Sequence, residues 1–236
     1  MQTGSSAFPD ASRRLLIVDD HPLVRDSLHS LLRSIDPKCN TEHVLSMGHM
    51  QTVLRPGHGF THVVLDLGLP DANGVDVILA ARKCDAELPI IVFTARTEQD
   101  LILRSLSMGV LGYIPKTLYN DVVANAFRTV LAGQIYVPRQ AVADMRQMRY
   151  GPTNPARITT SDPRELGLTE RQIDVLMLIL QGLPNKLICR RLDLAEGTVK
   201  VHVSAVLRAL GVRNRTQAVI AASTIGLRLD ENRLPA

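Results

Sequence analysis

Four short apolar segments in the first half of the chain each end in polar or charged residues. The segments are 13–20, 62–66, 88–95 and 110–116, and the polar residues at their ends are Asp19, Asp20, Asp66, Thr94 and Lys116. Consecutive apolar residues are typical of strands that are buried on both faces, as in a parallel sheet. The first half of the chain therefore predicts four buried strands, each with a polar end.

Segments with helical spacing separate these strands. A fifth, weaker strand is expected at 42–46, and helices are expected at 23–32, 48–54, 75–81, 100–108 and 121–131. Strands and helices that alternate at this length imply right-handed crossovers between parallel strands. The predicted fold of this half is an α/β fold with a five-stranded, doubly wound parallel sheet.

In a parallel sheet the carboxyl ends of all strands lie on one edge, so the five polar residues share that edge. Asp66 alone could merely start a turn, because Pro70, Asp71 and Gly74 follow it. The convergence of four strand ends instead favours a site. Clustered carboxylates repel one another and suit a divalent cation such as Mg²⁺, while a lysine and a threonine can donate to an oxyanion. Together these groups indicate phosphoryl chemistry.

Residues 13–135 resemble the receiver domain of bacterial two-component response regulators, which has a five-stranded flavodoxin-like fold. The resemblance is carried by "DD", "DLGLPDANG", "TA" and "GYIPK", which occur in the order of that family. It implies that Asp66 accepts a phosphoryl group from a phosphohistidine of a sensor histidine kinase. It also implies that Asp20, Asp66 and the Gly68 carbonyl bind Mg²⁺ directly and that Asp19 acts largely through water.

The same resemblance assigns roles to the remaining polar residues. Lys116 would bind the phosphoryl oxygens, and Thr94 and Tyr113 would be the switch pair that moves on phosphorylation. The chain departs from the commonest pattern next to the lysine, where Thr117 follows it and Pro115 precedes it. Both isomers of the Ile114–Pro115 bond are therefore open at this point.

The second half of the chain predicts four short helices in a small bundle. They are expected at 169–182, 184–192, 196–211 and 214–226. Thr169 and Gln172 form a capping-box pattern at the start of the first, and Asn214 and Gln217 are placed similarly at the start of the fourth. Pro184 is expected in the first turn of the second helix, where proline is tolerated.

The third of these helices has an apolar stripe and an opposite, mostly polar face. Val199, Val203, Val206 and Leu210 form the stripe. An ordinary solvated face is one interpretation of the other side. The alternative is DNA binding, because basic side chains neutralise phosphates and a helix fits the major groove. The predicted base contacts are Lys200, Val201 and Ser204, and the predicted phosphate contacts are Lys186, Arg190 and Arg208.

Residues 166–228 resemble the LuxR-type helix-turn-helix, through "LTERQIDVL", "NKLI" and "GTVKVHVSAVLRALGVRNR". Ala195 stands where that family usually has a serine, so a weaker cap is expected at the start of the recognition helix. No Phe, Tyr or Trp follows Tyr150, which excludes a base-stacking platform for single strands and leaves duplex DNA. A symmetric dimer would read an inverted repeat.

Charge divides the chain in the same way as the motifs. The net charge is −2 over residues 1–138, +3 over 139–164 and +3 over 165–236. We expect a flexible leader at 1–12, a receiver domain at 13–138, a linker that can hold a short helix at 139–165, and an all-α four-helix LuxR-type DNA-binding domain at 166–236.

This architecture resembles the NarL/FixJ response regulators, so the predicted function is transcription regulation rather than catalysis. Phosphorylation of Asp66 would control dimerisation and DNA binding. A phosphatase of the haloacid dehalogenase type would need a second Asp two residues after Asp66, where this chain has Gly68. A quorum-sensing regulator would need an aromatic-lined pocket, and the chain has only four Tyr and four Phe. A receiver that works without phosphorylation, by binding a protein or a ligand, remains the alternative.

Cellular location and partners follow from the same features. The three cysteines form no CxxC pair, which suits a reducing cytoplasm. We expect no secretory signal at the start and no membrane span, because no apolar run approaches the roughly 18 residues that a span needs. The expected partners are a sensor kinase, duplex DNA, RNA polymerase and, on activation, a second copy of the chain.

Overall fold

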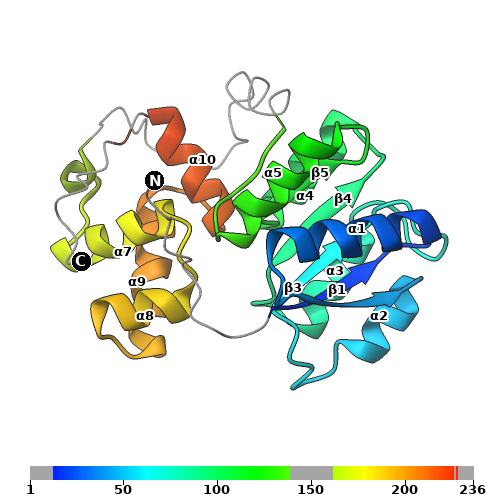
Figure 1. The fold of residues 1–236 in the computed structure, drawn as a ribbon. Helices are drawn as coiled ribbons and strands as arrows, with labels where there is room; N and C mark the ends of the chain where they lie inside the picture. The colour runs from blue at the N-terminus through cyan, green and yellow to red at the C-terminus, as the bar shows by residue number, and fades with distance from the viewer. Residues whose placement is uncertain (1–12, 139–161, 226, 228–236) are drawn as a thin grey trace, which may run out of the picture. The chain divides into compact units, whose positions relative to one another are not determined.

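The computed structural model describes residues 13–138, 162–225 and 227 of the 236-residue chain. The leader predicted at 1–12 and most of the linker predicted at 139–165, including any short helix before Gly151, lie outside the described residues. The chain forms two compact units, one with all the described strands and one with the helices after residue 162 (Figure 1).

The first unit is an α/β sandwich built on five parallel strands in the order β2-β1-β3-β4-β5. Strands and helices alternate as β1 (Arg14–Val18), α1 (Pro22–Ile35), β2 (Asn40–Val44), α2 (Met47–Val53), β3 (His62–Leu65), α3 (Asp76–Cys84), β4 (Ile90–Thr94), α4 (Gln99–Ser107), β5 (Gly112–Pro115) and α5 (Asn120–Leu131). The predicted doubly wound parallel sheet is confirmed.

Apolar side chains fill both faces of this sheet. On one face Leu15, Val64 and Ile91 pack with the buried residues of α1 and α5. Strand residues alternate between faces, so Leu16 and Leu65 point to the opposite face, where they are also fully buried. Burial on both faces explains why these strands read as continuous apolar runs.

Backbone hydrogen bonds carry the sheet ladder one residue beyond the strands. The Asp19 N–H donates to the Val44 carbonyl (3.1 Å), the Asp66 N–H to the Val18 carbonyl (2.9 Å), and the Lys116 N–H to the Thr94 carbonyl (2.8 Å). The polar residues that end the strands are therefore fixed on one edge by the backbone of the sheet itself.

Several elements differ in extent from those expected, among them α3, which ends at Cys84 rather than at residue 81. Helix α1 extends to Ile35, past the predicted end at residue 32, and β2 spans Asn40–Val44 rather than 42–46. β2 is an edge strand, and most of its residues are at least partly exposed, so its sequence lacks the continuous apolar run of the inner strands. No peptide bond within the described residues is cis, so the Ile114–Pro115 bond is trans.

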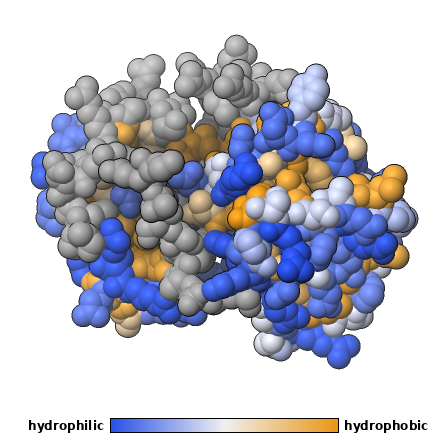
Figure 2. All heavy atoms as spheres, in the orientation of Figure 1, coloured by the Kyte–Doolittle hydropathy of each residue, from blue (hydrophilic) through white to orange (hydrophobic). Residues whose placement is uncertain are grey.

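The surface of the first unit mixes hydrophilic side chains with scattered hydrophobic ones, as Figure 2 shows for the visible face. Such a mixture is usual for a folded domain. Its large exposed apolar residues are Leu23, Leu45, Leu79 and Tyr119.

The second unit is the predicted bundle of four helices, preceded by one short turn of 3₁₀ helix. Its elements are η1 (Pro163–Leu166), α7 (Glu170–Leu180), α8 (Asn185–Leu192), α9 (Glu196–Ala209) and α10 (Arg215–Ile225). The Thr169–Gln172 capping box is present at α7. Pro184 differs from the prediction, because it is the N-cap residue of α8 and lies just outside its first turn.

The core of this bundle is built around α7, whose residues Val175 to Ile179 are all buried. Val199 and Val206 of α9 and its C-cap residue Leu210 are buried in the same core and Val203 is half-buried, so the predicted apolar stripe is confirmed. None of the described helices is both long and apolar enough to cross a membrane.

Candidate functional site

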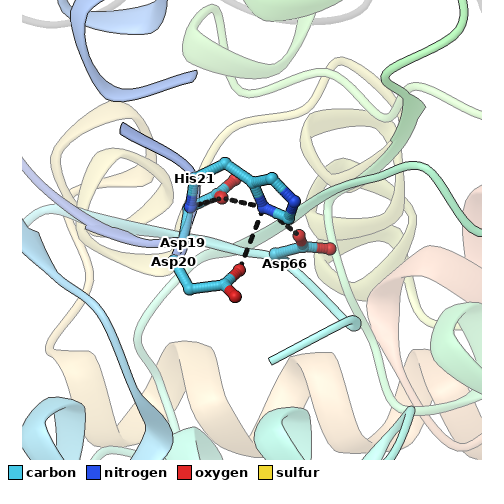
Figure 3. A group of neighbouring side chains, drawn as sticks. All are labelled: Asp19, Asp20, His21 and Asp66. Atoms are coloured by element: carbon cyan, nitrogen blue, oxygen red, sulfur yellow. Dashed lines mark hydrogen bonds and ion pairs between the residues drawn. The ribbon is translucent and has the colours of Figure 1, made fainter. Parts of the chain in front are cut away.

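Three carboxylates and a histidine converge at the carboxyl edge of the sheet (Figure 3). Asp19 and Asp20 follow β1, Asp66 follows β3, and His21 precedes α1. One ligand atom from each residue lies within 4.8 Å of the others. Asp19 and Asp66 are buried and form the floor of the cluster, whereas Asp20 is partly exposed, so solvent reaches the cluster from the side of Asp20.

Lys116 reaches the floor of this cluster from the end of β5. Its Nζ lies 2.6 Å from Asp66 Oδ2 and 2.7 Å from Asp19 Oδ2. The lysine side chain is itself largely buried, 13% exposed, so the charges interact with little screening by water. The structure thus brings together Asp19, Asp20, Asp66 and Lys116, as their positions at strand ends predict.

His21 is a member of the site that strand-end reasoning did not identify. Its Nδ1 lies 3.1 Å from Asp19 Oδ1, 2.9 Å from Asp20 Oδ1 and 3.9 Å from Asp66 Oδ2. Its backbone N–H also donates to Asp19 Oδ1 at 2.9 Å. The available signal was its position directly after the acid pair and before Pro22, at the turn into α1.

Asp66 is held as a carboxylate despite its burial. Burial by itself raises the pKa of Asp66, but several interactions together bring that pKa below its usual value. They are hydrogen bonds from the Lys116 and Thr94 side chains, the Lys116 charge, and the Gly68 N–H, which donates to Asp66 Oδ1 at 3.1 Å. An ionised, well-oriented carboxylate can act as a nucleophile.

The predicted switch pair, Thr94 and Tyr113, is fully buried. Both side chains contact the backbone of Arg96, in the loop between β4 and α4. The Tyr113 hydroxyl donates to the Arg96 carbonyl (2.9 Å), and the Arg96 N–H donates to Thr94 Oγ1 (3.3 Å). Burial, with the nearby Glu98 charge, raises the pKa of Tyr113, so this tyrosine stays protonated and able to donate.

The oxygen atoms at this edge suit Mg²⁺. Asp20 Oδ1 is buried and has no hydrogen-bond partner among the described residues, although His21 Nδ1 lies 2.9 Å from it. A buried oxygen of this kind needs a compensating charge or donor. Three carboxylates that lie this close together match the oxygen ligands of a hard divalent cation. The Gly68 carbonyl, the fourth predicted Mg²⁺ ligand, lies in the loop after β3, where the Gly68 N–H donates to Asp66 Oδ1.

The exposed side of α9 carries the predicted base contacts. Lys200, Val201, Ser204 and Arg208 line a shallow groove with Ala205. Val201 is 67% exposed, so its methyl groups are accessible on this side of the helix. The Ser204 hydroxyl donates to the Lys200 carbonyl at 2.9 Å. Lys186 and Arg190 are exposed on α8, the helix that precedes α9 in the motif.

The start of α9 is less well capped than the start of α7. Ala195 occupies the N-cap position and makes no side-chain hydrogen bond. At α7, by contrast, the Thr169 hydroxyl accepts from the Gln172 N–H and the Gln172 side chain accepts from the Thr169 N–H. The weaker cap expected from the sequence is present.

An acidic, lysine-bearing edge on a doubly wound sheet, followed by a helix-turn-helix bundle, defines a response regulator with a DNA-binding output domain. The family model "Response regulator receiver domain" matches residues 15–128, and the model "Bacterial regulatory proteins, luxR family" matches residues 166–222. The chain belongs to the NarL/FixJ family of response regulators, and it is a transcription regulator with receiver and LuxR-type domains.

Relatives match over most of their length. The nitrate/nitrite response regulator protein NarL of Escherichia coli K12 is 30% identical over 210 residues, which cover 87% of this chain and 93% of NarL. The activator DevR/DosR of Mycobacterium tuberculosis is 31% identical over 214 residues, which cover 90% of this chain and 94% of DevR/DosR.

A solved structure of RcsB from Salmonella enterica serovar Typhimurium, bound to a promoter in the presence of a phosphomimetic, shares the fold. It has a TM-score of 0.51 and 18% identity, with 91% of this chain and 100% of that chain covered.

Proposed function

We propose that a sensor histidine kinase phosphorylates Asp66 and that this phosphorylation controls DNA binding by α9. The observation that carries the proposal is the environment of Asp66. One of its oxygens accepts from Lys116 at 2.6 Å and the other from the Gly68 N–H at 3.1 Å, at the floor of an acid cluster. This arrangement orients a carboxylate for attack on a phosphorus atom and places a positive charge beside the product.

The residues of the cluster divide the work of phosphoryl transfer. Asp66 attacks the phosphoryl group of the kinase phosphohistidine, and the phosphorus–nitrogen bond breaks as the phosphorus–oxygen bond forms. Asp20, Asp66 and the Gly68 carbonyl would hold Mg²⁺, with Asp19 acting largely through water. Bound Mg²⁺ supplies positive charge that offsets the acids and the phosphoryl oxygens. Lys116 binds a phosphoryl oxygen and gives up its contact with the free Asp66 oxygen.

Thr94 and Tyr113 transmit the change to the surface. A phosphoryl group on Asp66 attracts the Thr94 hydroxyl. Before phosphorylation this hydroxyl accepts a hydrogen bond from the Arg96 N–H. A shift of Thr94 therefore disturbs the loop whose carbonyl anchors the Tyr113 hydroxyl. That loop leads into α4, so α4, β5 and α5 form the surface that responds first.

Activation produces a two-fold dimer on an inverted-repeat site. Helix α10 is apolar on more than one side, because Ala218 and Ala222 are buried while Val219 and Ile220 are half-buried. Its outer side can pack against its twin. Lys200, Val201 and Ser204 read bases, and Lys186, Arg190 and Arg208 contact phosphates. The regulator works in the cytoplasm, with the kinase, the DNA and RNA polymerase as partners.

Incubation with acetyl phosphate and Mg²⁺, followed by intact-mass measurement, tests the phosphorylation step. We expect one added phosphoryl group, absent in Asp66→Asn and in the presence of EDTA. Labelling that persists in Asp66→Asn would place the phosphoacceptor elsewhere. No labelling of the unaltered chain, by acetyl phosphate or by any sensor kinase, would favour a receiver that acts through protein or ligand binding instead.

A further inference from the structure

One acid lies on the otherwise basic and polar ridge of α9. Glu196, Lys200, Ser204 and Arg208 follow one another at intervals of four, which places them along one row of the helix surface. The Glu196 side chain is 67% exposed, and its Oε1 lies 3.0 Å from Lys200 Nζ. A carboxylate on a surface that approaches DNA repels every phosphate, so it weakens binding to DNA of any sequence.

We propose that Glu196 is a specificity-determining residue that selects cytosine in the major groove, beside the guanine selected by Lys200. The inference rests on the proposed DNA binding by α9. The first residues of a recognition helix contact base edges, and Glu196 is the first residue of α9. Its position therefore brings it to the bases rather than to the backbone.

The chemistry of a carboxylate restricts which base it can select. An ionised carboxylate only accepts hydrogen bonds. In the major groove guanine offers only acceptors, and thymine offers an acceptor and a methyl group. Adenine offers a donor beside an acceptor, and cytosine offers its N4 amino donor alone. Cytosine is the base whose own major-groove edge offers a donor and no acceptor, so it suits a carboxylate best.

The Glu196–Lys200 ion pair presents an acceptor and a donor side by side. Cytosine N4 offers the matching donor for Glu196, and guanine O6 offers the matching acceptor for Lys200. The two bases can belong to one base pair or to two adjacent base pairs. Lys200 Nζ lies 3.0 Å from Glu196 Oε1 in the free protein, so the donor and the acceptor already lie side by side. Gly197, the next residue, adds no bulk, and a Cβ there would meet nothing within 4 Å.

A purely structural role for Glu196 makes a different prediction. Because Ala195 provides no side-chain cap, a negative charge in the first turn stabilises α9 through the helix dipole. That role requires only charge, so losing it would lower the melting temperature and leave base preference unchanged.

Selection of binding sites from a random duplex library by the full-length, phosphorylated chain separates these roles. Glu196→Gln keeps the size of the side chain, and glutamine pairs with N6 and N7 of adenine. We expect the preferred base to change from cytosine to adenine at one position, by about tenfold in relative affinity. That position should lie next to the one whose preference Lys200→Ala relaxes. Binding to random DNA should become tighter.

Glu170→Gln is the matched control. Glu170 also lies in the first turn of a helix in the same unit, with a side chain 71% exposed and an ion pair to Arg164 at 3.6 Å, but it belongs to α7. This control should select the unaltered motif.

An unchanged motif for Glu196→Gln would overturn the inference. A change confined to the position read by Lys200 would overturn it too, because Glu196 would then act only by holding the lysine. If the unaltered chain selected no motif at all, the proposed function would fail together with the inference.

Discussion

His62 begins the central strand β3 and is buried, with 3% of its surface exposed. Burial, and then the charge of Arg13, lowers the pKa of His62 to about 4. In the unfolded chain a histidine has a pKa near 6.5. Between these two values the unfolded chain binds a proton that the folded chain does not bind.

Stability should therefore be full above about pH 6.5 and should fall as the pH drops toward 4, by about 3 kcal/mol from this residue. Urea denaturation at several pH values measures the effect. His62→Gln removes the titrating group. The free energy of unfolding of this variant should therefore fall by about 3 kcal/mol less than that of the unaltered chain over the same pH range. Equal pH dependence in both proteins would show that His62 does not carry this linkage.

Sequence reasoning located the residues that end strands and missed those whose role depends on side-chain direction. Asp66 and Lys116 are 50 positions apart, yet the ends of β3 and β5 bring them to 2.6 Å, as a parallel sheet requires. His21 is the N-cap residue of α1, and the conformation of its side chain brings its Nδ1 to 3.1 Å from Asp19 Oδ1. The link from Tyr113 to the Arg96 carbonyl depends on a loop conformation that no residue pattern encodes.

Helix α9 offers a direct test of how its missing cap limits stability. The backbone of Ala195 already has extended N-cap angles, φ −64° and ψ 149°. A serine hydroxyl there could accept from an N–H of the first turn, as Thr169 does at α7. Ala195→Ser should raise the free energy of unfolding of the second unit by about 1 kcal/mol, measured by thermal or urea denaturation.

Thr169→Ala is the opposite change, made at a formed capping box, and should lower that free energy by a similar amount. If Thr169→Ala destabilised the chain while Ala195→Ser had no effect, the start of α9 would be satisfied by another group.

Inner strands and amphipathic helices were predictable because burial imposes a pattern on them. β3 and β4 read as apolar runs, and the four-three-four spacing of Val199, Val203, Val206 and Leu210 marks the buried side of α9. The predicted position of β2 was two residues too late, because an edge strand tolerates polar residues on its exposed side and so lacks a clear apolar pattern. Helix ends such as Ile35 depend on the packing of the last turn rather than on periodicity.

The division of the chain into a sheet-bearing unit and a helical unit follows the division of charge along the sequence. The acidic first half gathers carboxylates around Asp66, while the basic second half exposes Lys186, Arg190 and Arg208. Each unit therefore has surface chemistry suited to one partner, a phosphoryl donor or DNA. We propose that phosphorylation of the sheet-bearing unit determines the DNA affinity of the helical unit.

That claim is tested most directly by the affinity of the full-length chain for its selected DNA site before and after treatment with acetyl phosphate and Mg²⁺. Fluorescence anisotropy at fixed salt should show binding tightened about tenfold or more, a coupling of roughly 1.4 kcal/mol or more, as is typical between linked sites. The gain should be absent in Asp66→Asn and should reverse as the phosphoryl group hydrolyses. Equal affinity in both states, or an equal gain in Asp66→Asn, would contradict the account.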